Sequence, residues 1–441
     1  MTGMASIFTE LQPPNAATGL YFSALLAVAL YCKFTRLLSV RNWDVLTLYL
    51  LAPGLVLLED PGSRPVWAYL WLVGASAYYF LRCLTDLTLV RRPALRPNLN
   101  LAGLAWLGGA LYVGLIAVAA NRSNDRSEKG GPPNLATAAS QVGEKSLRQL
   151  APPEVDGPSL GRWVEGGLAL LCHLSVVAGL VLIGKRHFED THAGMAAATF
   201  YLLLPYAWLL MPGAANGVGG WEHAWPMALM VWTVFAYRRP AVAGAFLGVA
   251  AGTAFFPVLT LPVWLSFYRR RGATRFTLAF VAAALLCLVA LGGLLWFKGE
   301  LPQGLLSAWS VSGWQPWQQS APTARGLWQD MPGHWAYRVP VFIAYLAFIV
   351  TTAFWPAPKN LAHVLALSAA ALIGIQLWYP DRGGVYVLWY LPFLLLLVFR
   401  PNLSACQPAP PADSWVERLA RRARRAVLRL LHRPEPAARV A

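Results

Sequence analysis

The chain has 441 residues, of which 57% are hydrophobic and only 13% are charged. Soluble domains carry about 25% charged residues, so this composition excludes an ordinary water-soluble domain and predicts an integral membrane protein. The excess of Lys and Arg gives a net charge of +16. In a membrane protein such an excess marks cytoplasmic loops, so nucleic acid is not expected as a partner. The five cysteines are scattered without a CxxC or Cys/His cluster, and neither a disulfide framework nor a metal site is expected.

Apolar runs recur along the whole chain. A helix needs ~20 mostly apolar residues to cross a bilayer. The candidate segments in chain order are Thr18–Cys32, Trp43–Leu58, Pro65–Leu84, Leu99–Ala120, Trp163–Gly184, His192–Met211, Trp221–Tyr237, Pro240–Tyr268, Phe276–Phe297, Val339–Trp355, Leu361–Tyr379 and Val385–Phe399. The pattern predicts an all-α fold, a polytopic transmembrane helix bundle. Residues 1–120 would form its N-terminal spans and residues 163–399 its membrane core.

The Lys and Arg residues between these segments predict the topology, because cytoplasmic loops retain positive charge. Arg238/Arg239 and Arg269–Arg271 flank the same apolar run, Pro240–Tyr268. A single span cannot have both ends in the cytoplasm, so either this run is a re-entrant helical hairpin or the charge rule fails here. Gly252 and Pro257 near the middle of the run supply turn chemistry and favour the hairpin. We therefore expect about eleven spans plus this hairpin, in a multi-pass protein of the cell membrane.

Two long polar segments and the C-terminal region lie between or beyond these spans. Residues 121–162 are rich in Gly, Pro and Ser, which predicts an external flexible loop. Residues 298–338 form a second external segment. Residues 400–441 predict a cytoplasmic linker followed by a basic amphipathic helix, because apolar residues recur at helical spacing among many Arg from Ser414 to Arg433. Such a helix lies on anionic membrane lipids; a solvated basic tail is the alternative.

Acidic residues at the expected external face are candidates for chemistry. Glu59 and Asp60 follow the second apolar run, where a carboxylate could deprotonate an acceptor hydroxyl. Two acids can also simply end a helix at the membrane interface. Glu222 and His223 follow the glycine-rich turn GAANGVGG and could relay a proton or hydrogen-bond a sugar. A belt of interfacial Trp residues with polar neighbours explains the same residues equally well. Asp381 is a further external acid.

Tryptophans and glycines form two further patterns. Trp314, Trp317 and Trp328 belong to a Trp-rich external segment, and indole faces stack on the C–H faces of sugars. Contact with a sugar or lipid headgroup and ordinary packing of the loop both remain open. Three glycines at four-residue spacing, from Gly244 to Gly252, predict close helix packing in lipid.

The order of features from Gly194 to Phe399 resembles that of the GT-C membrane glycosyltransferases, in particular their polyprenol-phosphate-mannose-dependent branch. The residues that carry the resemblance read LLLPYAWLLMPGAANGVGG, WEHAWPMALMVWTVFAYRRP and AVAGAFLGVAAGTAFFPVLTLPVWLSFYRRR, followed by GWQPWQQSAPTARGLW and YPDRGGVYVLWYLPFLLLLVF. Two features depart from the family pattern. Ala254 stands where the family commonly has a Lys, and no D-x-D pair occurs in an early external loop.

The resemblance implies a GT-C-like core in residues 163–399 and a sugar transferase. The donor would be a polyprenyl-phosphate sugar and the acceptor a glycan or lipid at the external face, without a metal or bound cofactor. Asp60, with Glu59 as its competitor, would be the base, since the family usually holds its base in an external loop. Arg382 could meet the donor phosphate in place of the missing Lys. A transporter, flippase or polymerase for lipid-linked glycans, or a non-catalytic membrane component, are the alternatives.

Overall fold

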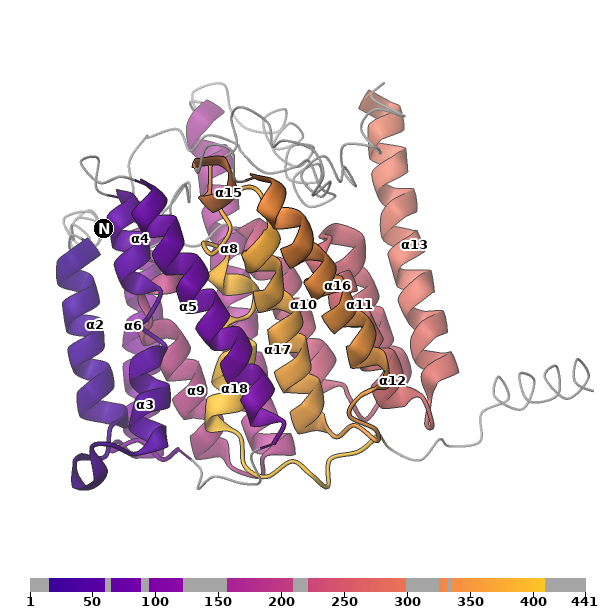
Figure 1. The fold of residues 1–441 in the computed structure, drawn as a ribbon. Coiled ribbons are helices and arrows are strands. Elements are labelled where there is room, and N and C mark those ends of the chain that lie inside the picture. The colour runs from indigo at the N-terminus through magenta and orange to yellow at the C-terminus, as the bar shows by residue number, and fades with distance from the viewer. Residues whose placement is uncertain are drawn as a thin grey trace, which may run out of the picture.

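The computed structural model describes residues 16–59, 65–88, 95–121, 157–208, 221–298, 325–330 and 335–408. Within these ranges every regular element is a helix, which confirms the all-α fold class. The longer helices stand side by side with roughly aligned axes (Figure 1). The amphipathic helix predicted between Ser414 and Arg433 lies outside the described residues.

The helices follow one another in three groups. The first group contains α2 (Ala16–Tyr31), α3 (Val40–Thr47), α4 (Ala52–Glu59), α5 (Pro65–Asp86) and α6 (Leu101–Asn121). The second contains α8 (Gly157–His187), α9 (Thr191–Leu203), α10 (Trp221–Phe235), α11 (Pro240–Thr253), α12 (Leu261–Tyr268) and α13 (Ala273–Lys298). The third contains α15 (Leu327–Asp330), α16 (Arg338–Phe354), α17 (Leu361–Trp378) and α18 (Leu391–Phe399). Short 3₁₀ turns are η1 (Phe34–Arg36), η2 (Pro205–Ala207), η3 (Phe256–Thr260), η5 (Trp335–Tyr337) and η6 (Val387–Trp389).

Four helices contain stretches that are long and apolar enough to cross a bilayer. These stretches are Leu101–Ala119, Val164–His187, Ala273–Leu294 and Leu361–Trp378. They support membrane association. The expected eleven spans are not confirmed, because several of the other predicted spans are interrupted or short. The predicted external loop is also shorter than expected, since α8 already begins at Gly157.

Most of the cations that the structure describes lie at one end of the bundle, which we call the basic end. It is the lower end in Figure 1. Hydrogen bonds join its connections: Lys33 Nζ donates to Asn98 Oδ1 over 3.0 Å, and Lys359 Nζ donates to Ser266 Oγ over 2.8 Å. The cations of this end are Lys33, Arg36, Arg41, Arg96, Lys185, Arg186, Arg238, Arg239, Arg269, Arg270, Arg271, Arg275, Lys359 and Arg400. The Lys and Arg residues that separate the apolar segments are thus gathered at one end, as the charge pattern predicts.

The run Trp43–Leu58, predicted as one span, forms two helices. α3 ends at Thr47 and α4 begins at Ala52, beside Pro53, which has no N–H to continue a helix from α3. Side chains from other parts of the bundle bond carbonyl groups at the break. The bonds run from Tyr79 Oη to the Thr47 oxygen (2.5 Å), from Tyr206 Oη to the Leu48 oxygen (2.6 Å) and from Trp71 Nε1 to the Leu50 oxygen (2.6 Å).

Two other predicted spans are also shorter than expected. In the run His192–Met211, α9 ends at Leu203 because Pro205 disfavours helical backbone at the residue before it. In the run Val385–Phe399, α18 has only 9 residues and is preceded by η6. Proline therefore limits several of the apolar helices.

The run Pro240–Tyr268 turns back on itself. α11 leads away from the basic end, η3 reverses the chain and α12 returns. At the return, Tyr268 Oη donates to the Tyr237 carbonyl oxygen over 2.6 Å, and Gly272 lies so close to Pro240 that a Cβ at 272 would be 2.6 Å from the proline Cγ. The two ends of the run therefore lie together at the basic end.

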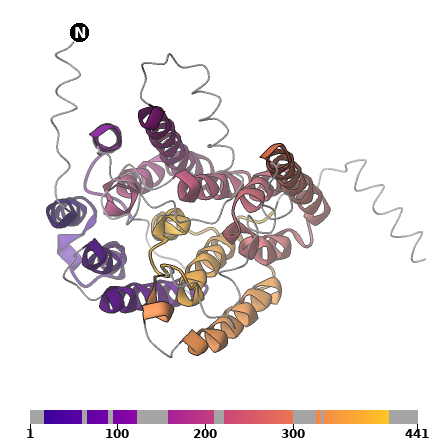
Figure 2. The same ribbon diagram turned by 90° about the horizontal axis from the view of Figure 1, so that it is seen from above.

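α17 is the central helix of the bundle. In its most apolar stretch 89% of the residues are buried, against 11% in α13. Seen from above, α17 and α18 lie inside a ring of the other helices, while α13 stands at the periphery (Figure 2). Several helices therefore pack around α17 and the segments at its ends.

A seam of glycines joins α11 to α13. A Cβ on Gly252 would lie 2.6 Å from the Cβ of Cys287, and one on Gly248 would overlap the carbonyl oxygen of Phe280. Only residues without a side chain allow the two backbones to approach this closely. The helix-packing role predicted for these glycines is confirmed.

We expect Gly248→Ala to destabilise the protein by about 1–3 kcal/mol, because the added methyl group forces the two helix backbones apart. Gly293→Ala is the matched control. It lies in α13, where a Cβ would meet nothing within 4 Å, and alanine favours a helix over glycine by about 1 kcal/mol. Unfolding of the purified variants in detergent, followed by circular dichroism, measures both. Equal stability of the two variants would contradict the seam.

Candidate functional site

Short helices bring chain turns into the upper part of the bundle, at the end opposite the basic end. α11 has 14 residues and α18 has 9, which correspond to lengths of about 21 Å and about 14 Å at 1.5 Å per residue. Both are shorter than the ~30 Å hydrocarbon core of a bilayer. The turns η3 and η6, which adjoin these helices, therefore meet within the thickness of the bundle.

The turn after α17 carries two of the predicted site residues, Asp381 and Arg382. The short segment before α15 fixes this turn: Arg382 N–H donates to the carbonyl oxygen of Arg325 over 2.5 Å, and Arg325 N–H donates to Asp381 Oδ1 over 3.3 Å. Arg382 has a φ of 52° and Gly384 a φ of 93°. The left-handed backbone at Gly384, with Leu72 of α5 against it, requires a glycine.

Five aromatic rings from three segments pack beside this turn, and we call them the aromatic cluster. The Trp389 ring stacks with Phe256 at 4.2 Å and with Tyr386 at 4.4 Å between ring centroids. Phe255 stacks with Tyr379 at 5.5 Å. Trp389, Phe256 and Tyr379 are buried, whereas Phe255 and Tyr386 are half-buried. The buried rings thus support two rings whose surfaces remain partly accessible.

His223, in the first turn of α10, joins the aromatic cluster through a hydrogen bond. Trp389 Nε1 donates to His223 Nδ1 over 3.1 Å. Because Nδ1 accepts this bond, the proton of the neutral imidazole is on Nε2. The half-buried His223 can therefore donate a hydrogen bond to an oxygen atom of a ligand.

Charged groups surround this imidazole. Glu222 and Arg382 both lie within electrostatic range of His223, and Asp381 and Arg382 both act on Tyr386. Burial raises the pKa of the Asp381 carboxyl above its usual range, although the Arg325 N–H and the positive charge of Arg382 oppose this effect. A carboxyl group of this kind is suited to accept or donate a proton closer to neutral pH.

The structure brings four of the predicted site residues together: Glu222, His223, Asp381 and Arg382. A fifth, Trp328 of α15, lies against the end of α17, where its Nε1 donates to the carbonyl oxygen of Leu377 over 3.1 Å. Asp60, Trp314 and Trp317 lie outside the described residues, as does the side chain of Glu59, which ends α4.

The sequence did not single out any of the five cluster residues, Phe255, Phe256, Tyr379, Tyr386 and Trp389. Aromatic residues at span ends are typical of membrane interfaces, so their spacing alone does not indicate a site. One available signal was the concentration of Tyr, Trp, Asp and Arg in the run YPDRGGVYVLWY. In the described part of the chain no group of three His, Cys, Asp or Glu side chains has the placement of a metal site.

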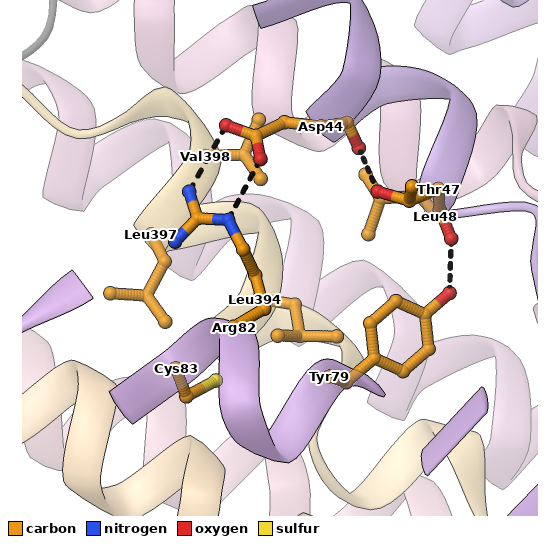
Figure 3. A pocket seen from close by; sticks show the side chains of 9 residues that line it. All are labelled: Asp44, Thr47, Leu48, Tyr79, Arg82, Cys83, Leu394, Leu397 and Val398. Atoms are coloured by element: carbon orange, nitrogen blue, oxygen red, sulfur yellow. Dashed lines mark hydrogen bonds and ion pairs between the residues drawn. The ribbon is translucent and has the colours of Figure 1, made fainter. Parts of the chain in front are cut away.

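A second polar feature, which the sequence did not indicate, lies at the basic end. Asp44 of α3 binds the guanidinium of Arg82 through both carboxylate oxygens, over 2.9 and 3.1 Å (Figure 3). Asp86 pairs with Arg82 over 3.4 Å and also with Arg400, after α18. Both carboxylates are buried, so the network ties three helices together around a small cavity that Tyr79 and Cys83 also line.

Searches of protein-family models, of curated proteins and of solved structures found no match to this chain.

We expect Asp86→Asn to destabilise the protein by about 1–3 kcal/mol, because the half-buried Arg400 loses its carboxylate partner and Arg82 keeps only Asp44. Asp190→Asn is the control. Asp190 caps α9 by accepting a hydrogen bond from Ala193 N–H, and asparagine caps a helix equally well. Thermal unfolding in detergent compares the two variants. An Asp86→Asn protein as stable as Asp190→Asn would show that the network contributes no stability.

Proposed function

We propose that this protein is a membrane glycosyltransferase of the GT-C type. It moves a sugar from a polyprenyl-phosphate donor to a glycan or lipid acceptor at the external face of the cell membrane. The proposed topology has about eleven spans plus the re-entrant run Pro240–Tyr268, with the basic end in the cytoplasm. The site formed by Asp381, Arg382, His223 and the aromatic cluster then lies toward the external side.

The observation that supports this function best is the combination of groups in that site. A carboxyl group with a raised pKa, a guanidinium group and an imidazole donor lie around partly accessible aromatic rings. Sugars bind proteins through stacking of their C–H faces on aromatic rings together with hydrogen bonds to their hydroxyl groups. A lipid-linked donor additionally requires a cation for its phosphate, and guanidinium groups bind phosphate well.

The proposed chemistry is a displacement at the anomeric carbon of the donor sugar. The carboxylate removes the proton from the acceptor hydroxyl, the acceptor oxygen bonds to the anomeric carbon, and the bond to the polyprenyl phosphate breaks. Arg382 stabilises the phosphate that leaves, and His223 Nε2 donates to a sugar hydroxyl. Phe255 and Tyr386 provide the stacking surface.

Two carboxylate sets compete for the role of base. Asp381 is favoured by the described geometry, because it adjoins Arg382 and is held by Arg325. Asp60, with Glu59, is favoured by the resemblance to the GT-C family. Glu222 then serves as a binding residue beside His223, and Trp314, Trp317 and Trp328 as further contacts for the sugar or its acceptor.

The topology predicts that both ends of the run Pro240–Tyr268 face the cytoplasm. We expect single cysteines at Arg239 and Arg270, in a variant without the native cysteines, to react with a membrane-impermeant maleimide from the same side of sealed vesicles. Both side chains are exposed. Lys185→Cys marks the same basic end and serves as the reference. Labelling of the two positions from opposite sides would exclude the re-entrant hairpin.

The chemistry predicts that Asp381→Asn lowers the transfer rate by about 10²–10⁴-fold, the usual contribution of a general base. Transfer from a radiolabelled polyprenyl-phosphate sugar in reconstituted vesicles measures the effect. Because burial raises the pKa of Asp381, the wild-type rate should fall with decreasing pH at a higher pH than the ~3.9 of a free aspartate. This acid limb should be absent in Asp381→Asn.

Two further variants separate the possible results. Arg382→Gln should raise the KM for the lipid-linked donor more than it lowers kcat, because it removes a phosphate contact. Asp190→Asn, at the opposite end, should retain full activity. Full activity of Asp381→Asn together with loss of activity in Asp60→Asn would assign the base to Asp60. Full activity in a variant that lacks Asp381, Asp60 and Glu59 would exclude the proposed chemistry.

A further inference from the structure

The buried Asn42 fixes the connection between α2 and α3 at the basic end. Asn42 accepts a hydrogen bond from Lys33 N–H over 2.8 Å, and its amide donates to the carbonyl oxygens of Lys33 (2.9 Å), Arg36 and Leu37 (both 3.2 Å). Only 2% of Asn42 is exposed. The connection is therefore a defined structure.

The segment before α6 is fastened to the same place. Asn98 N–H donates to the Leu30 oxygen over 2.6 Å, and its side-chain amide donates to the carbonyl oxygens of Ala29 and Cys32 at the end of α2. Its side-chain oxygen accepts from Lys33 Nζ over 3.0 Å. Arg96, two residues before Asn98, is thus held beside the α2–α3 connection.

Two arginines in this region have no counter-charge among the described residues. Arg41, in the first turn of α3, has its Nε and one terminal nitrogen buried without a hydrogen-bond partner. The nearby charge that acts on it is the positive charge of Arg96. Within the described residues no carboxylate pairs with either arginine. A partly buried guanidinium that lacks a partner and lies near a second cation is unfavourable by itself and favours an anion between the two.

The connection that leads to Arg41 also exposes apolar side chains. Phe34 is 62% exposed, Leu37 67% and Leu38 fully exposed, all in the same α2–α3 connection. Figure 1 shows this connection projecting from the basic end beside α2 and α3. Inorganic phosphate has no apolar surface that could pack on these side chains. The hydrocarbon chain of a lipid covers them and removes their apolar surface from water, which is favourable. The occupant thus combines an anionic head with an apolar tail.

We propose that Arg41 and Arg96 form a binding site for the phosphate of an anionic phospholipid at the basic end. The fork of the Arg41 guanidinium binds the phosphate oxygens, Arg96 and Lys33 add positive charge, and the lipid chain contacts Phe34, Leu37 and Leu38. This proposal needs only membrane association and is independent of sugar transfer.

The test measures binding of phosphatidylglycerol to the purified full-length protein in nonionic detergent, by native mass spectrometry. We expect Arg41→Gln with Arg96→Gln to weaken binding by about 10–30-fold, as two arginine contacts near lipid phosphate would. Arg269→Gln with Arg270→Gln removes the same charge from exposed positions at the same end and should change binding little. Phosphatidylcholine should bind weakly to all three proteins.

The thermal stability without lipid separates binding from folding. The Arg41/Arg96 double variant should unfold at the wild-type temperature or above, because it loses a repulsion. Equal binding of phosphatidylglycerol by this variant and by wild type would overturn the site. Equal loss in the Arg269/Arg270 variant would also overturn it in favour of general surface charge. Displacement of the lipid by excess inorganic phosphate would overturn the assignment to a lipid.

Discussion

The bundle depends on side chains that hydrogen-bond the carbonyl groups of interrupted helices. In an apolar environment a free carbonyl costs several kcal/mol, so a break is tolerated only where the protein itself supplies a donor. Tyrosine hydroxyls supply many of these donors. Tyr79 and Tyr206 bond the break between α3 and α4, and Tyr268 bonds the turn before α11. A phenol buries a large apolar ring while its hydroxyl reaches a distant backbone, so these residues pack the core and complete the hydrogen bonds at once.

This constraint explains which parts of the fold could be predicted from the sequence. Mean hydropathy and charge placement predict an all-α membrane protein, the run that turns back after Pro240 and the gathering of cations at one end. They do not predict the break inside Trp43–Leu58, because its donors Tyr79 and Tyr206 come from residues far away in the sequence. Local hydropathy treats Tyr and Trp as interface residues, and their role as internal donors becomes visible only in three dimensions.

The candidate site, too, could be predicted only in part from the sequence. Charged residues are scarce in this chain, so Glu222, His223, Asp381 and Arg382 stood out from their apolar neighbours, and the structure brings them together. The aromatic rings that position them did not stand out among the 20 Trp and 16 Tyr of the chain. Arg82 was missed for a different reason. It lies within an apolar run, and its neutralisation by Asp44 and Asp86 depends on a neighbouring helix and on a later turn of α5.

The incomplete helices connect the fold to the proposed site. If α11 and α18 each crossed the whole bundle, the turns that adjoin them would lie at its surface, far from one another. Because both are short, η3 and η6 meet beside the end of α17, and the ring of Phe256 stacks on that of Trp389. The reversal after α11 is therefore a condition for the aromatic cluster, and the glycine seam that holds α11 against α13 positions it. Phe256, Pro257 and Thr260 of η3 and all three residues of η6 are buried, and burial within protein is the condition that irregular backbone needs in an apolar environment.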